Sequence, residues 1–327
     1  MKVLLLVNSS ASSVTARGRV VIQKALSADH EVTLAETSRR GHVTRLAQGA
    51  AAEGVDVVVV LGGDGTLNES ANGLAGTETA LAALPGGSTN VFARTLGLPD
   101  DPIEATGVLL EALARGAVRQ VGLGSVNGRY FLFHAGMGFD AAIVARVDRR
   151  AALKRYASHP LFLFAAFETW FRHYDHSRPR FSVRVPTARA AGSGPSARAA
   201  GSGPSAGPAE VDVVDDVYFA ICLNTNPYTY LGTRPLNLSP GTDLDTGLAM
   251  LSVRSLDFTT IVGLGLSALA SGDHLRHSRA VDYRTDVSSL CVEGYGPFPY
   301  QVDGEYLGEV SHLEFRHEPG VLRLVMP

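Results

Sequence analysis

Residues 55–66 read VDVVVVLGGDGT, an apolar run that ends in a cluster of glycines around one aspartate. The run is typical of a buried strand, and the glycines permit a tight turn that brings the backbone close to a ligand. A helix from Leu67 onward would point free N–H groups and the positive end of its dipole at that turn. The stretch therefore predicts a phosphate-binding turn in which Asp64 holds Mg²⁺ or accepts a proton.

Two familiar phosphate-binding motifs do not fit this turn. A P-loop needs a lysine directly after a glycine, whereas Lys2, Lys24 and Lys154 each follow another residue type. The dinucleotide fingerprint needs a further glycine where Asn68 stands, and Asp64 would place a negative charge beside the pyrophosphate. The sequence therefore indicates a phosphate-binding turn that is neither a P-loop nor a dinucleotide-binding turn.

A second turn repeats the arrangement one unit later along the chain, in LPGGSTNVFAR at 84–94. A short apolar strand again ends in glycines, and small hydrogen-bond donors such as Ser88 follow. Because both turns lie at the ends of neighbouring strands, we expect them to face one crevice.

The first part of the chain alternates apolar strands with helical segments, which predicts a parallel sheet covered by helices. From about residue 117 the pattern becomes mainly β, beginning with a hairpin that turns at Asn127-Gly128. We expect strands near 2–8, 30–36, 55–61 and 79–84, and helices near 14–28, 41–53, 67–75 and 101–115. Further strands are expected near 180–186, 211–223, 247–253, 289–293 and 312–325.

The amino-acid composition of the chain excludes several classes of function. A chain of 327 residues with 45% hydrophobic residues can form two domains with their own cores, and a net charge of -3 gives no reason to expect a nucleic-acid partner. Two cysteines provide neither a disulfide framework nor a zinc ribbon, which favours a reducing, cytoplasmic location. The N-terminal apolar run is too short for a signal sequence, and the stretch at 161–171 is about half as long as a membrane-spanning helix.

The ordered motifs of this chain resemble the diacylglycerol kinase catalytic family, which includes bacterial lipid kinases and sphingosine and ceramide kinases. The resemblance implies an N-terminal α/β nucleotide-binding domain, like that of phosphofructokinases and NAD kinases, and a C-terminal β-sandwich that holds the lipid. It assigns residues 1–118 and about 306–327 to the first domain and 119–305 to the second. The motifs that carry it are VNSSA at 7–11, Thr37, GGDGTLNE at 62–69, PGGSTNVFAR at 85–94, GMGFDA at 136–141 and VDGE at 302–305.

The resemblance also implies site residues. Glu305 matches the proton acceptor, with Asp303 and Asp64 as further catalytic carboxylates, and Asp140 is expected to contact the substrate. ATP is expected to bind Asn8, Ser9, Ser10, Ala11, Thr37, Gly62, Gly63, Asp64, Gly65, Thr66, Leu67, Asn68 and Ser88.

Two departures from the family pattern concern acidic positions. Val91 stands where many members have an aspartate that helps to order the cleft. The family's structural magnesium site matches PGTDLDTGLAML at 240–251, where Thr246 replaces an aspartate. Asp243 and Asp245 are the carboxylates that remain as candidate metal ligands.

The expected function is an ATP-dependent lipid kinase that phosphorylates diacylglycerol to phosphatidic acid, with Mg²⁺ as cofactor. A sphingoid-base or other lipid kinase, an NAD kinase-like enzyme and a non-catalytic nucleotide or lipid sensor remain as alternatives. The NAD kinase would share the GGDGT loop but use a soluble acceptor. A sensor would need no proton acceptor, so the acidic pair near the C-terminus argues against it.

Two segments of the second half bear on partners. The basic segment 146–155, beside the aromatic stretch 161–171, suits peripheral contact with an anionic membrane surface, although the helical spacing of its phenylalanines also fits a core helix. ARAAGSGPS occurs twice in tandem at 188–205, and we expect 187–209 to form a mobile loop. The sequence is also compatible with a homodimer.

Overall fold

The computed structural model describes residues 1–37, 39–149, 168–169, 174–186 and 211–327. The tandem repeat and its flanks at 187–209, together with most of the segments 146–155 and 161–171, lie outside the described residues. Within the described part of the chain, no helix is both long and apolar enough to cross a bilayer.

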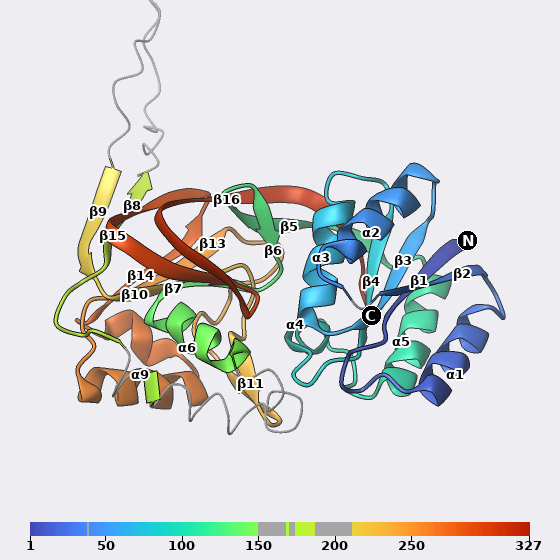
Figure 1. The fold of residues 1–327 in the computed structure, drawn as a ribbon, viewed down its shortest axis with the longest axis horizontal. Helices are drawn as coiled ribbons and strands as arrows, with labels where there is room; N and C mark the ends of the chain where they lie inside the picture. Colours follow the sequence, from blue (N-terminus) through green and yellow to red (C-terminus); the bar gives the residue numbers. More distant parts are fainter. Residues whose placement is uncertain (38, 150–167, 170–173, 187–210) are drawn as a thin grey trace, which may run out of the picture.

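The N-terminal half forms the predicted parallel sheet, in the order β2-β1-β3-β4 (Figure 1). Helices α1 and α5 pack together, as do α2 and α3, and the central strand β3 is buried along its whole length. The strands are β1 (Lys2–Asn8), β2 (Glu31–Thr37), β3 (Val57–Gly62) and β4 (Ala80–Pro85). The helices are α1 (Ala16–Leu26), α2 (His42–Ala52), α3 (Asp64–Leu74), α4 (Val91–Thr95) and α5 (Pro102–Ala114).

These elements confirm the expected α/β domain, with two refinements. Helix α3 begins at Asp64, three residues earlier than expected, so the last residues of the GGDGT motif belong to its first turn. The short helix α4 follows the second glycine turn and was not predicted. It begins after Asn90, which has a φ of 51° and closes the turn by exchanging hydrogen bonds with Gly87.

The second domain is rich in strands, as predicted. The hairpin at Asn127-Gly128 is confirmed: Val126 pairs with Arg129, and both turn residues have positive φ. The strands are β5 (Val118–Val126), β6 (Arg129–Phe131), β7 (His134–Gly138), β8 (Phe181–Pro186), β9 (Val211–Val217), β10 (Phe219–Leu223), β11 (Thr229–Leu231), β12 (Arg234–Leu236), β13 (Leu248–Val253), β14 (Val281–Val287), β15 (Ser289–Val302) and β16 (Glu305–Val325). The helices are α6 (Phe139–Asp148), α9 (Phe258–Leu269) and the 3-10 helix η2 (Asp273–His277).

Strands from distant parts of this domain share one core. Side chains of β5 to β10 and of β13 to β16 form one buried cluster, which includes Phe131, Phe181, Phe298 and Phe315. Phe181 and Phe298 pack with ring centroids 4.8 Å apart, and Phe131 meets Phe315 edge to face at 6.2 Å. Aromatic burial of this kind stabilises the strand-rich domain independently of the α/β sheet.

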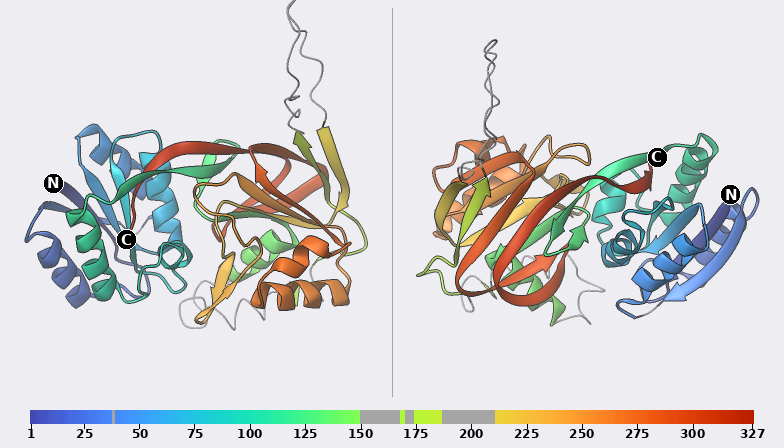
Figure 2. Two further views of the ribbon diagram at one scale, coloured as in Figure 1. Left: turned by 180° about the vertical axis from the view of Figure 1, so that it is seen from behind. Right: turned by 90° about the horizontal axis from the view of Figure 1, so that it is seen from above.

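The return of the chain to the α/β domain lies later than the expected residue 306. Strand β16 first pairs with β15, from Glu305 opposite Val302 to Arg316 opposite Ser289. It then runs beside β5 and meets the parallel sheet where Leu324 pairs with Leu81 of β4. Figure 2 shows β5 and β16 crossing together between the domains. The expected boundary was therefore wrong for residues 306–316, because strand pairing keeps them in the second domain.

Candidate active site

The two glycine turns lie in direct backbone contact. The Gly86 N–H donates to the Gly62 carbonyl at 2.9 Å. A Cβ atom on Gly86 would lie 2.8 Å from the Gly62 nitrogen, and one on Gly87 would lie 2.9 Å from the Cα of Gly63. Only glycine fits at such distances, so the sequence pattern follows from the contact between the turns. The predicted juxtaposition of the two turns is confirmed.

Loops from four strands meet at this edge of the sheet. Strands β1 and β3 are neighbours from which the chain continues in opposite directions, the arrangement at which open α/β sheets bind ligands. Asn8, at the end of β1, donates to the Thr66 hydroxyl at 2.9 Å and accepts from the Ser10 N–H at 3.0 Å. The Ser9 N–H donates to the carbonyl of Thr37 at 3.2 Å. The predicted nucleotide residues of these loops therefore share one edge.

The start of helix α3 suits a phosphate group. Within the described chain no side chain caps this helix. The Thr66 N–H donates to the Gly63 carbonyl at 2.9 Å, so the N–H groups before it in the first turn, such as that of Gly65, are the ones that suit a ligand. Ser9, Ser10, Gly65 and Ser88 are exposed around the turns. Thr37 is buried, and its hydroxyl donates to the Arg39 carbonyl at 3.5 Å.

Asp64 has a structural role that the sequence analysis did not anticipate. Its two carboxylate oxygens accept the N–H groups of Val91 and Phe92, each at 3.0 Å. Burial raises the pKa of Asp64 above its usual range, and these two hydrogen bonds oppose the shift. Asp64 therefore caps α4 and ties the second glycine turn to the first. Asp64 is partly buried, and because a carboxylate can accept about four hydrogen bonds, a lone pair remains for a ligand.

Replacing Asp64 by asparagine is expected to lower stability as well as activity. The amide nitrogen cannot accept a hydrogen bond, so either the Val91 or the Phe92 N–H loses its partner, at a cost of about 1–3 kcal/mol. Chemical denaturation of Asp64→Asn beside the exposed variant Glu53→Gln measures this loss. Equal stability of both variants would show that the cap contributes nothing.

Asn68 and Asp303 join the two domains. Asn68 is 2% exposed, and its amide donates to the Asp303 carboxylate at 2.7 Å and to the Tyr130 carbonyl at 2.9 Å. Its oxygen accepts from Arg129 at 3.1 Å. The polar atoms of Asn68 are engaged at the domain junction in this structure, and its contact with ATP stays a prediction.

Asp303 is buried and fully engaged. Besides Asn68, its carboxylate accepts the N–H groups of Leu132, Phe133 and His134 at 2.7, 3.0 and 3.1 Å. Burial raises its pKa to about 6, against the opposing effect of these donors. The residue also begins a tight turn, with φ values of 47° at Asp303 and 76° at Gly304. Four donors around one carboxylate indicate a structural role rather than the expected catalytic one.

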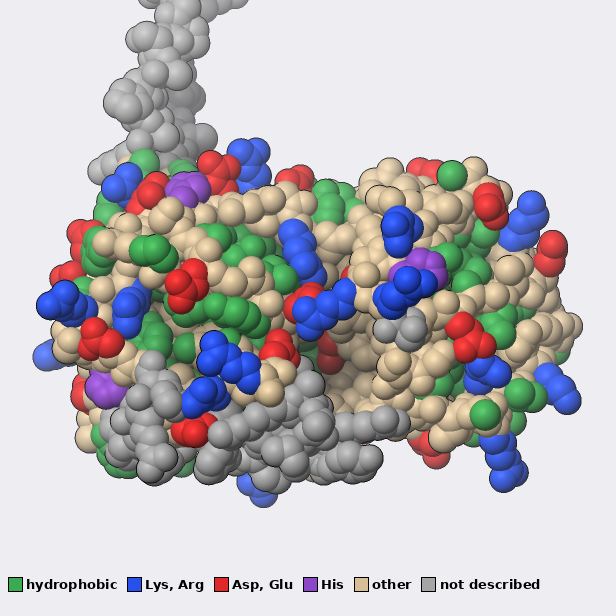
Figure 3. Space-filling model, viewed as in Figure 1, with side chains coloured by type: hydrophobic (Ala, Val, Ile, Leu, Met, Phe, Trp, Pro, Cys, Tyr) green, Lys and Arg blue, Asp and Glu red, His purple; other side chains and the backbone are tan. Residues whose placement is uncertain are grey.

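Glu305 lies at the cleft between the domains, held by two arginines. One carboxylate oxygen is 2.7 Å from Arg129 of β6, and the other is 3.0 Å from Arg40, which precedes α2. The Arg40 side chain is 76% exposed, whereas that of Glu305 is 20% exposed. These residues line a cavity of about 260 Å³ with Asn68 and Glu69. Figure 3 shows the hollow between the domains, with basic and acidic side chains at its rim.

Sequence reasoning missed both arginines. Arg129 follows the predicted hairpin turn, but nothing local in the sequence indicates that its partner is 176 residues away. A second missed contact lies between the domains at Arg94, whose guanidinium is 3.7 Å from the centroid of the Tyr230 ring and donates to the Gly232 carbonyl.

Asp140 lies inside the second domain. It is 5% exposed and accepts from the Tyr228 hydroxyl at 2.6 Å and from the Gln301 amide at 2.8 Å. Burial raises the pKa of Asp140, while both hydrogen bonds oppose the shift. A contact between Asp140 and a substrate, as predicted, would require Tyr228 or Gln301 to release its hydrogen bond to the carboxylate.

The candidate metal ligands do not converge. Asp245 forms an ion pair with Arg119 at 2.8 Å, and Asp243 accepts the Asp245 N–H at 2.9 Å. Thr246 closes the loop through hydrogen bonds with the Asp243 backbone. Within the described ranges, no group of three acidic, histidine or cysteine side chains is placed to hold a metal. The residues present therefore do not fit the structural magnesium site expected at Asp243 and Asp245.

His134 should make the stability of the protein depend on pH. Its ring is 4% exposed, it packs 4.4 Å from the Tyr228 ring, and its Nδ1 has no hydrogen-bond partner among the described residues. Burial lowers its pKa from 6.5 to about 3. Since only the unfolded chain gains this proton between pH 6.5 and 3, the contribution of His134 to stability should fall as the pH drops through that window, by about 1.4 kcal/mol per pH unit. Asp303, whose pKa is raised to about 6, contributes in the opposite direction below pH 6, so the effect of His134 is read from the difference between wild type and a variant.

Denaturant unfolding of wild type and of His134→Phe across this range measures the contribution of His134. The variant should show a shallower loss of stability with falling pH, whatever its absolute stability. Identical slopes would show that His134 is not the group responsible.

Comparison with known proteins links this geometry to lipid kinases. Residues 2–126 match the diacylglycerol kinase catalytic domain. A diacylglycerol kinase of Bacillus subtilis is 39% identical over 121 residues, which is 36% of this chain and 39% of that protein. A probable YegS-like lipid kinase of Chromohalobacter salexigens is 35% identical over 168 residues, 50% of this chain and 52% of the relative. The matches thus span about half or less of these relatives.

The structural similarity covers more of the chain than the sequence similarity does. A solved diacylglycerol kinase structure from Bacillus anthracis superposes with a TM-score of 0.68, covering 100% of this chain and 97% of that one. At 21% sequence identity this likeness establishes the shared two-domain fold.

Proposed function

We propose that this protein, whose residues 2–126 match the diacylglycerol kinase catalytic domain, is a member of that family and an ATP-dependent lipid kinase. The observation that best supports this proposal is a series of contacts that runs from helix α3 to the cleft. Asn68 follows the glycine turn by a few residues, accepts from Arg129, and Arg129 in turn holds Glu305. A carboxylate is thereby fixed in the cleft, next to the element that would receive the phosphates.

The proposed reaction transfers the γ-phosphoryl group of ATP to a lipid hydroxyl. The phosphates would lie against the N-terminus of α3 and the two glycine turns, with Ser9, Ser10 and Ser88 as donors. The acceptor hydroxyl would enter from the side of the strand-rich domain. Its oxygen forms a bond to the γ-phosphorus, the bond between that phosphorus and the β–γ bridging oxygen breaks, and ADP leaves.

Glu305 is the best-placed acceptor for the hydroxyl proton. Asp303 accepts four N–H groups and Asp64 two, whereas Glu305 lines the open cavity. Arg129 would keep one oxygen in place, and Arg40 would have to leave the other before a hydroxyl could approach it. Because Arg40 is mostly exposed and close to the nucleotide edge, a bound phosphate could attract it away.

Mg²⁺ fits the nucleotide edge better than the loop at 240–251. Asp64 is the carboxylate there, and its remaining lone pairs suit a hard cation. When bound with ATP, the ion would neutralise charge on the transferring phosphoryl group.

The proposed acceptor is diacylglycerol, and the product is phosphatidic acid. Support comes from the match to the diacylglycerol kinase catalytic domain and from the relative of that name. A sphingoid base or another lipid alcohol remains an alternative acceptor, since the YegS-like relative is described only as a lipid kinase.

The test is transfer of label from γ-labelled ATP to diacylglycerol, sphingosine, ceramide and NAD in parallel. Label in phosphatidic acid is the expected result, and label in another lipid would change the acceptor while keeping the reaction. Label only in NADP would replace the lipid kinase by an NAD kinase. Nucleotide binding without any transfer would indicate a sensor.

A further inference from the structure

Helix α9 exposes its apolar side chains to solvent. Its sequence, FTTIVGLGLSAL, contains no charged residue. Val262, Leu266 and Leu269 are 41%, 64% and 40% exposed, and Phe258 is 57% exposed. Their spacing of three to four residues places them along one face of the helix. The exposed face of a helix in a globular protein is ordinarily polar, so this face is unusual.

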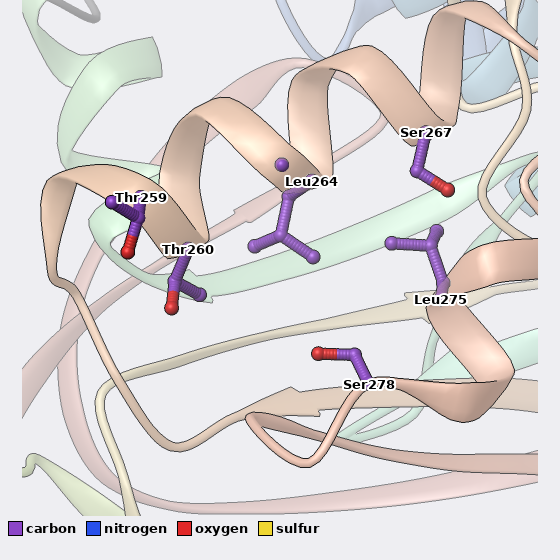
Figure 4. A pocket seen from close by; sticks show the side chains of 7 residues that line it. Thr259, Thr260, Leu264, Ser267, Leu275 and Ser278 are labelled. Carbon is purple, nitrogen blue, oxygen red and sulfur yellow. The ribbon is translucent and has the colours of Figure 1, made fainter.

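The hydroxyl groups of α9 point the other way. Thr260 and Ser267 line a cavity of about 310 Å³ beneath the helix, together with Leu264, Leu275 and Ser278 (Figure 4). Ser267 is 8% exposed, and its hydroxyl has no hydrogen-bond partner in the described part of the chain. The helix thus carries large apolar groups on two sides: Ile261 and Leu264 pack against the core of this domain, whereas Val262, Leu266 and Leu269 face solvent. The largest exposed apolar patch of a monomeric protein is often a functional contact surface.

We propose that the exposed face of α9 docks on the surface of a lipid bilayer. Four partly exposed apolar side chains offer roughly 400 Å², about half of the ~800 Å² that each subunit of a stable dimer buries. A second copy of the chain would therefore gain too little contact from this face. A bilayer needs only that a few side chains enter the boundary between headgroups and acyl chains.

The charges around α9 fit an anionic bilayer. Arg254 precedes the helix and Arg279 follows it, and both are exposed. Arg276 is exposed as well, but its guanidinium donates to the Pro240 carbonyl at 2.8 Å and lies 5.2 Å from the centroid of the Tyr283 ring, and the exposed Asp273 lies between it and the helix in the sequence. Asp257, the acidic residue at the helix start, is engaged as its cap: it accepts the Thr260 N–H and the hydroxyls of Ser255 and Thr259. The Ser255 hydroxyl is the main cause of its lowered pKa. Exposed arginines at both ends can contact lipid phosphates while the apolar face enters the bilayer.

This inference rests on the proposed function for its purpose, because a lipid kinase must reach an acceptor that resides in a bilayer. Docking through α9 would bring the strand-rich domain to the source of that acceptor. The binding step can nevertheless be measured without any phosphoryl transfer, so failure of docking and failure of the kinase reaction are distinguishable.

The experiment measures co-flotation of the full chain with vesicles of phosphatidylcholine and phosphatidylglycerol in equal amounts. The double variant Leu266→Ser with Leu269→Ser should bind these vesicles at least tenfold more weakly, since burying each leucine is worth about 1.5–3 kcal/mol. The control variant Val20→Ser with Ile103→Ser removes equally exposed apolar groups from the α/β domain and should bind like wild type. In a Trp170→Phe background, which removes the tryptophan already present in the chain, Leu266→Trp should show a blue-shifted emission with vesicles.

The outcomes separate the alternatives. Wild type that does not float, an α9 variant that floats like wild type, or an unshifted emission of Leu266→Trp would each overturn docking through α9. A wild-type dimer that the α9 variant converts to a monomer would reassign the face to a second copy of the chain. If docking holds, the α9 variant should lose activity on diacylglycerol in vesicles but keep it on a short-chain diacylglycerol in solution. Vesicle binding without transfer to any acceptor would contradict the proposed kinase and leave the docking intact.

Discussion

Glu305→Gln is expected to lose turnover by about 10²–10⁴-fold, the usual contribution of a general base. Glutamine keeps the size of the side chain and can still accept a hydrogen bond from Arg129, but it cannot take the proton of the acceptor hydroxyl. ATP affinity should stay near the wild-type value because Glu305 lies in the cleft and not among the nucleotide turns. Initial rates with saturating ATP and diacylglycerol, beside an independent nucleotide-binding measurement, give the two quantities.

The matched control is Glu309→Gln, an exposed residue of the same strand. It should leave both turnover and ATP affinity unchanged. If Glu305→Gln turned over within a few-fold of wild type while binding ATP normally, another group would be the base. Asp64 would then be the next candidate for the base, because the carboxylate of Asp303 already accepts four hydrogen bonds.

Asp303→Asn is expected to cause the largest loss of stability. Each carboxylate oxygen accepts two N–H groups, so an amide nitrogen in place of either oxygen leaves two buried donors without an acceptor. At about 1–3 kcal/mol for each donor, the free energy of unfolding should fall by roughly 2–6 kcal/mol. This is a large part of the ~5–15 kcal/mol typical of a folded protein.

Denaturant titration of Asp303→Asn beside the exposed control Asp215→Asn tests this expectation. The Asp303 variant should also weaken the junction of the two domains, because Asn68 loses one of its partners. Limited proteolysis between residues 118 and 134 should therefore become faster. A stability equal to that of the control would mean that the four hydrogen bonds do not hold the junction together.

Local sequence patterns were sufficient for the α/β sheet. Strands β1, β3 and β4 are short, mainly apolar runs, whereas β2 mixes apolar and polar residues. Each lies next to a helical segment, and these patterns depend only on residues close in the sequence. The glycines of both turns could also be interpreted from the sequence. A backbone that must approach another backbone closely has no room for a Cβ atom, so glycine itself indicates the contact. Asn127-Gly128 specified its hairpin in the same local way.

The sequence by itself thus determined the sheet, the glycine turns and the resemblance to a lipid kinase family. Only the tertiary structure decided the partners of the carboxylates: Asp64 caps a helix 27 residues away, and Asp303 binds Asn68 across 235 residues. It alone paired Glu305 with Arg40 and Arg129, kept residues 305–316 in the second domain and left the apolar face of α9 exposed. The physical reason is that strand patterns and turns are fixed by nearby residues, whereas the partner of a polar side chain depends on how distant segments pack.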